Sequence, residues 1–184
     1  MGGTFDPIHV GHLIAASDVH SALSLDQVIF MPAGQPWQKA QHSVSPSAHR
    51  FEMVQRAVAH DERFVASNLE ILRDGPTYAI DTVRQLLDEN PGIEIFWIVG
   101  TDALAGIPTW REWEEFVSLV TVVSVNRESV SDAAVPFAHT FVQMPLVRIS
   151  ASDVRRRFHD GFETRYLVPD AVRDYVNEQG LYRE

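Results

Sequence analysis

Two histidines three residues apart lie near the start of the chain, directly behind a glycine-rich turn. The segment over residues 2–12 reads GGTFDPIHVGH. Adjacent glycines let backbone N–H groups approach a ligand closely, because no Cβ intervenes. An apolar-periodic stretch follows, so we expect His9 and His12 to meet at the N-terminal end of a helix, where the dipole favours anions. Glycines, helix N–H groups and two imidazoles together predict a binding site for a polyphosphate.

A metal site is the main alternative for this histidine pair, and a plain turn is the alternative for the two glycines. Zinc usually needs further ligands at close spacing. The next histidine is His20, and the chain contains no cysteine. The sequence therefore predicts no metal site at this histidine pair, and Mg²⁺ is expected with few or no direct protein ligands, bound mainly through the phosphates of a substrate.

The composition is that of one α/β domain spanning residues 1–184. Hydrophobic residues make up 45% of the chain, and no apolar run is long enough to cross a membrane. Without cysteine or a signal peptide, the protein is expected to be cytoplasmic. A net charge of −10 argues against nucleic-acid binding. The composition leaves open whether the chain is a monomer or a homo-oligomer.

Apolar runs and amphipathic segments alternate along the chain. We expect helices over 45–60, 77–89, 109–118, 150–159 and 170–179. We expect strands over 27–31, 64–67, 69–72, 94–99, 121–125 and 141–144. Strands alternating with helices predict a doubly wound parallel sheet, whose ligands bind at the carboxyl ends of the strands.

The segment over 2–12 resembles the signature of the nucleotidylyltransferase superfamily, a Gly-rich turn followed by His-x-Gly-His. Its GGTFDPIH form is similar to the nicotinate-mononucleotide adenylyltransferase branch. The resemblance implies a Rossmann-like nucleotidylyltransferase fold. It also implies a reaction of ATP with nicotinate mononucleotide, giving nicotinate adenine dinucleotide and pyrophosphate. Implied ATP contacts in this segment come from Gly2, Gly3, Thr4, Phe5, Gly11 and His12.

In such proteins a buried strand precedes the glycine-rich turn, but here only Met1 stands before Gly2. We therefore expect the first strand to be missing, or truncated before Gly2. Losing a central strand exposes unpaired backbone on its neighbours. A chain extended by roughly six to ten residues, about one strand's length, is expected to be more stable.

A second phosphate-binding segment is expected near residue 150. Ser150 and Asp153 have the spacing of a capping box, and Arg155 follows in the first turns of the helix. Taken alone, the arginines there could simply form a solvated basic patch. The segment resembles the superfamily motif Ile-Ser-Ser-Thr-x-x-Arg, with Ala151 in place of the second Ser. The resemblance implies that Ser150, Ser152 and Arg155 bind the triphosphate.

The part of the site that binds nicotinate mononucleotide is expected at two further helix starts. Thr109 to Glu112 reads as a capping box whose free N–H groups could receive a carboxylate, and Thr77 is a candidate N-cap. Trp110 could stack on a planar ring or simply pack in the core. By resemblance, Gly100 and Asp102 bind ATP. Nicotinate mononucleotide is expected to contact Lys39, Thr77, Tyr78, Asp102, Trp110 and Arg111.

The resemblance implies in-line attack of the mononucleotide phosphate on the α-phosphorus of ATP, without a covalent enzyme intermediate. His12 is assigned to the α-phosphate, His9 to neighbouring oxygens and Arg155 to the leaving pyrophosphate. Replacement of His12 by Ala is expected to cost about 2.7–4 kcal/mol in the barrier. Alternatives are transfer to nicotinamide mononucleotide or, less favoured, phosphopantetheine transfer, cytidylyl transfer, or a non-catalytic nucleotide sensor.

Overall fold

The computed structural model describes residues 1–35, 44–126 and 135–183. The described strands are β1 (Gly2–Gly3), β2 (Val28–Pro32), β3 (Phe64–Ala66), β4 (Phe96–Gly100), β5 (Thr121–Asn126) and β6 (Thr140–Gln143). The described helices are α1 (Val10–Leu23), α2 (Ser47–Val58), α3 (Ala79–Glu89), α4 (Thr101–Gly106), the 3₁₀ helix η2 (Ile107–Thr109), α5 (Trp113–Leu119), α6 (Ala151–His159) and α7 (Asp170–Glu178).

All paired strands are parallel. They form two three-stranded groups, β1-β2-β3 and β4-β5-β6. The groups meet where β1 lies beside β4, with Gly2 against the ring of Trp97. Read across this junction, the order is 3-2-1-4-5-6, the order of a doubly wound nucleotide-binding sheet. The predicted fold class is confirmed.

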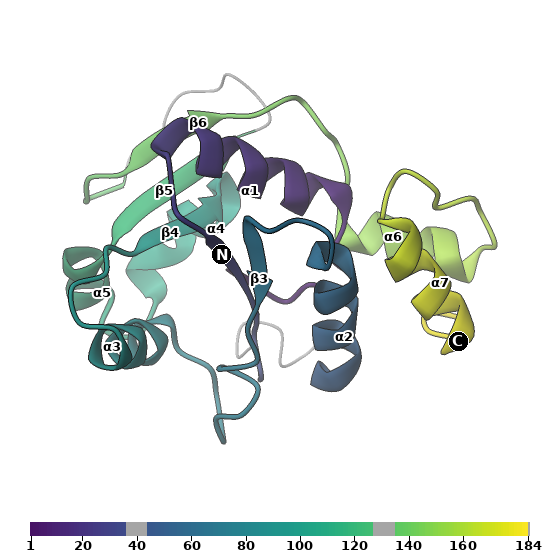
Figure 1. Ribbon diagram of the computed structural model, residues 1–184, viewed down its shortest axis with the longest axis horizontal. Coiled ribbons are helices and arrows are strands. Elements are labelled where there is room, and N and C mark those ends of the chain that lie inside the picture. The colour runs from purple at the N-terminus through teal and green to yellow at the C-terminus, as the bar shows by residue number, and fades with distance from the viewer. Residues whose placement is uncertain (36–43, 127–134, 184) are drawn as a thin grey trace.

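Two apolar cores cover the two faces of the sheet. Along β4, Ile98 belongs to one core, whereas Trp97 and Val99 belong to the other, as the two-residue period of a strand requires. The first core takes side chains from α1, α2, α6 and α7, and the second takes them from α3, α4 and α5. Figure 1 shows α1 lying over the β4–β6 side and α6 and α7 beyond α2. A strand buried on both faces explains the continuous apolar run FWIV at 96–99.

The short strand β1 follows the first residue of the chain. Gly2 and Gly3 pair with Met31 and Pro32 of β2, and the Met1 amine donates a hydrogen bond of 2.8 Å to the carbonyl oxygen of Ile29. Burial lowers the pKa of this amine to about 5, so it is neutral at pH 7. The Met1 carbonyl also accepts from the Met31 N–H at 3.0 Å, so Met1 and the two glycines together tie the glycine-rich turn to β2.

Several predicted elements differ from the structure. The predicted strand over 69–72 is a turn, and the predicted helix over 109–118 is wrong at its start. There the 3₁₀ helix ends at Thr109, whose hydroxyl donates to the Gly106 carbonyl at 2.8 Å, and Trp110 is extended. Glu112, in the left-handed region with φ of 50°, is the N-cap of α5 instead. Thr109 therefore opens no α-helix.

Thr77 is not an N-cap either, because its polar groups are used elsewhere. Its hydroxyl accepts from the Gln35 N–H at 3.1 Å, and its own N–H donates to the Gln35 carbonyl at 3.2 Å. Tyr78 is the N-cap of α3. The remaining predicted helices and strands agree with the structure to within about two residues. Over the described ranges, no helix has the length and apolarity needed to cross a membrane.

Candidate nucleotide-binding site

A cavity of about 710 Å³ opens where the strand order reverses, at the carboxyl ends of β1 and β4. From β1 the chain continues to β2 and β3 on one side, and β4 leads to β5 and β6 on the other. This is the switch point at which doubly wound sheets bind their ligands. Of the predicted ATP-binding residues, those lining the cavity are Gly2, Gly3, Thr4, Phe5, Gly11, His12, Gly100 and Ser150.

His9 and His12 meet at the N-terminal end of α1, as predicted, and both line this cavity. His9 is the N-cap of α1, and its ring stacks on that of His12 with centroids 3.7 Å apart and planes inclined by 22°. The backbone N–H of His9 donates to Nδ1 of His12 at 3.2 Å. Because Nδ1 accepts this bond, the neutral His12 ring carries its proton on Nε2. His12 can therefore donate from Nε2 to a ligand oxygen.

The two glycines have aromatic rings close to their Cα atoms. A Cβ on Gly2 would lie 3.2 Å from the Trp97 ring, and one on Gly3 would lie 3.0 Å from the ring of Phe5. Phe5 itself is buried, with φ of 50°, and its ring meets His12 edge-on at 5.1 Å between centroids. Side chains at 2 and 3 would therefore require the Trp97 and Phe5 rings to move by a few tenths of an ångström.

A buried arginine that the sequence analysis missed braces the same turn. Arg50 of α2 is 1% exposed and donates to the carbonyl oxygens of Thr4 at 2.9 Å, Gly34 at 3.1 Å and Ser45 at 2.9 Å. The nearby carboxylate of Asp6 favours its charged form, although burial lowers the pKa of the Arg50 guanidinium. No signal in the sequence separates Arg50 from other arginines of amphipathic helices.

Asp6 extends this brace to the C-terminal segment. Its Oδ1 accepts from the Tyr182 hydroxyl at 2.6 Å, and its Oδ2 accepts from the Ser45 N–H at 3.1 Å. Burial and this carboxylate raise the pKa of Tyr182, so the phenol stays protonated as the donor. Asp6 lies inside the signature segment, a position that could have drawn attention to it.

Helix α6 has the predicted cap. The hydroxyl of Ser150 accepts from the Asp153 N–H at 3.1 Å and donates to its carboxylate at 2.8 Å. Arg155 donates to the carbonyl oxygen of Asp6 at 2.7 Å and to the hydroxyl of Ser152 at 3.3 Å. Ser150 lines the cavity, whereas Ser152 and Arg155 are outside its described lining. Arg155 thus ties α6 to the glycine-rich turn.

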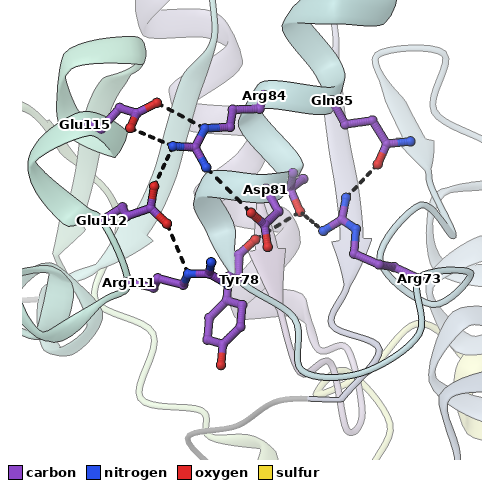
Figure 2. Close-up of polar contacts among 9 residues, drawn as sticks. Arg73, Tyr78, Asp81, Arg84, Gln85, Arg111, Glu112 and Glu115 are labelled. Atoms are coloured by element: carbon purple, nitrogen blue, oxygen red, sulfur yellow. Dashed lines mark hydrogen bonds and ion pairs between the residues drawn. The ribbon is translucent and has the colours of Figure 1, made fainter.

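The opposite wall carries aromatic side chains and one cation. Tyr78, Trp110 and Arg111 line the cavity together with Thr77. The guanidinium carbon of Arg111 lies 5.0 Å from the centre of the Tyr78 ring (Figure 2). Trp110 also packs on Phe116, with ring centroids 5.4 Å apart, so it serves the core as well as the cavity.

Two buried titratable groups line the cavity floor. Burial favours the neutral Met1 amine and raises the pKa of Glu70, whose Oε1 accepts from the Thr82 hydroxyl at 2.9 Å. Within the described lining, Arg111 is the only lysine or arginine. Its guanidinium is therefore the basic side chain of that wall.

The positions of two predicted substrate-binding side chains are not described by the structure. Lys39 lies outside the described residues, and Asp102 belongs to α4 but its side chain is not described. Within the described ranges, no three His, Cys, Asp or Glu residues come together as a metal site. A metal bound here would take its ligands from phosphates and water, as Mg²⁺ commonly does.

The fold and the cavity define a nucleotide-binding protein of Rossmann-like architecture. The model of the cytidylyltransferase-like family matches residues 1–157. The chain is 45% identical over 186 residues to a relative from Streptomyces coelicolor, covering all of this chain and 99% of that protein. A Nocardioides sp. relative is 46% identical over 188 residues, covering 99% and 92%. Both are named "Probable nicotinate-nucleotide adenylyltransferase".

Solved structures support the fold. The chain resembles a Plasmodium falciparum nicotinic acid mononucleotide adenylyltransferase complexed with NaAD, with a TM-score of 0.82, 17% identity, and coverage of 98% of this chain and 94% of that one. The chain belongs to the cytidylyltransferase-like family, in the branch of the nicotinate-nucleotide adenylyltransferases.

Proposed function

We propose that the protein transfers the adenylyl group of ATP to nicotinate mononucleotide, releasing pyrophosphate and forming nicotinate adenine dinucleotide. The observation that carries this proposal is one cavity with the His9–His12 pair on one wall and Tyr78, Trp110 and Arg111 on the other. The relatives named for this activity support it, since they match the chain over its whole length.

Catalysis at the reacting phosphates needs hydrogen-bond donors rather than a general base. The attacking phosphate is already anionic at neutral pH, so its oxygen can bond to the α-phosphorus directly. The bond from the α-phosphorus to the bridging oxygen breaks in line, and that oxygen leaves with pyrophosphate. Negative charge grows on the α-phosphate oxygens, and fixed donors aimed there lower the barrier.

His12 is the residue we assign to the α-phosphate. Its ring is held by the His9 N–H at Nδ1 and by the Phe5 edge, so Nε2 has a fixed direction. Such preorganised donors need no reorientation during the reaction. We assign His9, Ser150 and the N–H groups of the glycine-rich turn to the neighbouring phosphate oxygens.

Arg155 and Ser152, unlike Ser150, do not line the cavity in its described part. Both lie outside its described lining, and Arg155 is bound to the Asp6 carbonyl. We propose that Arg155 holds α6 against the turn and reaches the pyrophosphate only through its remaining N–H groups. Lys39 and Asp102 remain proposed ligands of the mononucleotide and the ribose hydroxyls, respectively.

Mg²⁺ is proposed as the metal, held by phosphate oxygens. When bound it neutralises charge on the triphosphate. The protein's part is to hold the two substrates with their reacting phosphates in line.

Pyrophosphate release tests the function. The chain is given Mg·ATP with nicotinate mononucleotide or, in parallel, nicotinamide mononucleotide at equal concentration. We expect release with the acid and much slower release with the amide. A preference for the amide would favour the nicotinamide alternative, and no release with either would favour a nucleotide sensor.

A further inference from the structure

A charged relay at the cavity wall consists of Arg111, Glu112 and Arg84. None of these residues belongs to a predicted phosphate-binding motif. Arg84 lies on α3, whereas Arg111 and Glu112 lie in the turn before α5 (Figure 2). One oxygen of Glu112 accepts from Nε of Arg111 at 3.0 Å, and the other accepts from Arg84 at 2.5 Å. The carboxylate of Glu112 therefore joins the two arginines.

Arg84 is itself fixed from a second side. It donates to both carboxylate oxygens of Glu115, at 3.0 and 2.6 Å, and lies 3.8 Å from Asp81. The hydrogen bonds from Arg84 lower the pKa of Glu112, which keeps that carboxylate charged at neutral pH. Because Glu115 belongs to α5, Arg84 locks the start of α5 to α3, the helix that begins just after Tyr78.

The relay sets where the Arg111 guanidinium lies. The Nε–H of Arg111 donates to Glu112, and the guanidinium carbon lies over the Tyr78 ring at the cavity wall. Within the described part of the chain, the two terminal nitrogens of Arg111 have no hydrogen-bond partner. A guanidinium presents paired N–H groups that match a carboxylate, and an uncharged amide cannot use the same charge.

The helix start at Thr109, which sequence reasoning offered as the carboxylate site, does not exist. Arg111 is the remaining permanent cation of the described lining, and it stands next to Tyr78 and Trp110, where a planar ring would lie. We propose that Arg111 determines preference for the acid over the amide, and that Glu112 and Arg84 are positioning residues for it.

This proposal rests on the proposed function. Arg84 also supplies charge balance, because it pairs with Asp81 and Glu115 as well as with Glu112. Removal of Arg84 leaves Arg111 paired with Glu112 but leaves Asp81 and Glu115 without this cation beside the cavity. A substrate carboxylate would feel that repulsion, but a neutral amide would not.

The test measures the ratio of kcat/KM for nicotinate mononucleotide to kcat/KM for nicotinamide mononucleotide. Arg111→Gln is expected to lower this ratio about tenfold through KM for the acid, as loss of one hydrogen bond to a charged group implies. Arg84→Gln is expected to lower it about two- to fivefold, since exposed pairs are weak. Arg84→Lys should recover part of that loss.

Arg173→Gln is the matched control. Arg173 also pairs with two carboxylates, Asp170 and Asp174, but lies on α7 away from the cavity. Its ratio should equal that of the unmodified protein, and thermal melts of all variants check that each is folded. An acid preference that persists unchanged in Arg111→Gln overturns this proposal alone. Turnover of neither mononucleotide by the unmodified protein overturns the proposed function.

Discussion

Arg50 offers the sharpest test of how the glycine-rich turn is held. Arg50→Met keeps the length of the side chain but removes the guanidinium, which is 1% exposed and donates to three backbone carbonyls. The carbonyl oxygens of Thr4, Gly34 and Ser45 then lose their donor. At a buried site each such loss costs at least about 1 kcal/mol, or about 3–5 kcal/mol for the three. At about 2–4 °C per kcal/mol for a domain of this size, Tm should fall by roughly 6–20 °C.

The assay is urea unfolding followed by circular dichroism, with Arg56→Met as the matched control. Arg56 lies on the same helix, but its side chain is 37% exposed and pairs with Glu52. Exposed pairs contribute about 0–1 kcal/mol, so the control should lose at most about that much. If Arg50→Met lost no more free energy of unfolding than Arg56→Met, the bracing role of Arg50 would be refuted.

Two further predictions concern the cavity. His12→Ala removes the proposed Nε2 donor and should raise the barrier by about 2.7–4 kcal/mol, which lowers kcat by about 10²–10³. The rate of pyrophosphate release measures this loss. A rate within about threefold of that of the unmodified protein would contradict the assignment. Glu70→Gln should increase the free energy of unfolding more at pH 8 than at pH 4, because burial raises the pKa of Glu70. The folded protein favours the neutral acid, so stability is lost as pH rises through the folded pKa. Urea unfolding measures the difference in free energy of unfolding between Glu70→Gln and the unmodified protein. A difference that does not grow from pH 4 to pH 8 would contradict this prediction.

The sheet and the histidine pair were predictable because local signals specify them. Apolar runs such as FWIV at 96–99 mark strands buried on both faces, and the spacing of His9 and His12 places both at the start of α1. The cap at Ser150 was predictable for the same reason, since its partner Asp153 is three residues away. Short-range patterns of this kind need no knowledge of tertiary contacts.

Long-range contacts account for the errors at Thr77 and Arg50, and a local turn accounts for the error at Thr109. Thr77 has the side chain of a cap, but it bonds to Gln35, 42 residues away. The capping-box pattern at Thr109 predicted a helix start, but Thr109 ends a 3₁₀ helix and its hydroxyl donates to the Gly106 carbonyl. Arg50 was missed because its acceptors lie in the glycine-rich turn and at both ends of the connection from β2 to α2, which only the folded chain brings together.

The most direct test of the proposed reaction follows the phosphorus atoms. The chain is incubated with nicotinate mononucleotide and Mg·ATP labelled at either the α- or the γ-phosphorus. Adenylyl transfer predicts that α-label enters a dinucleotide containing the pyridine base and that γ-label leaves in pyrophosphate. Label from the α-position recovered only as AMP, or unchanged ATP in both samples, would contradict adenylyl transfer to this mononucleotide.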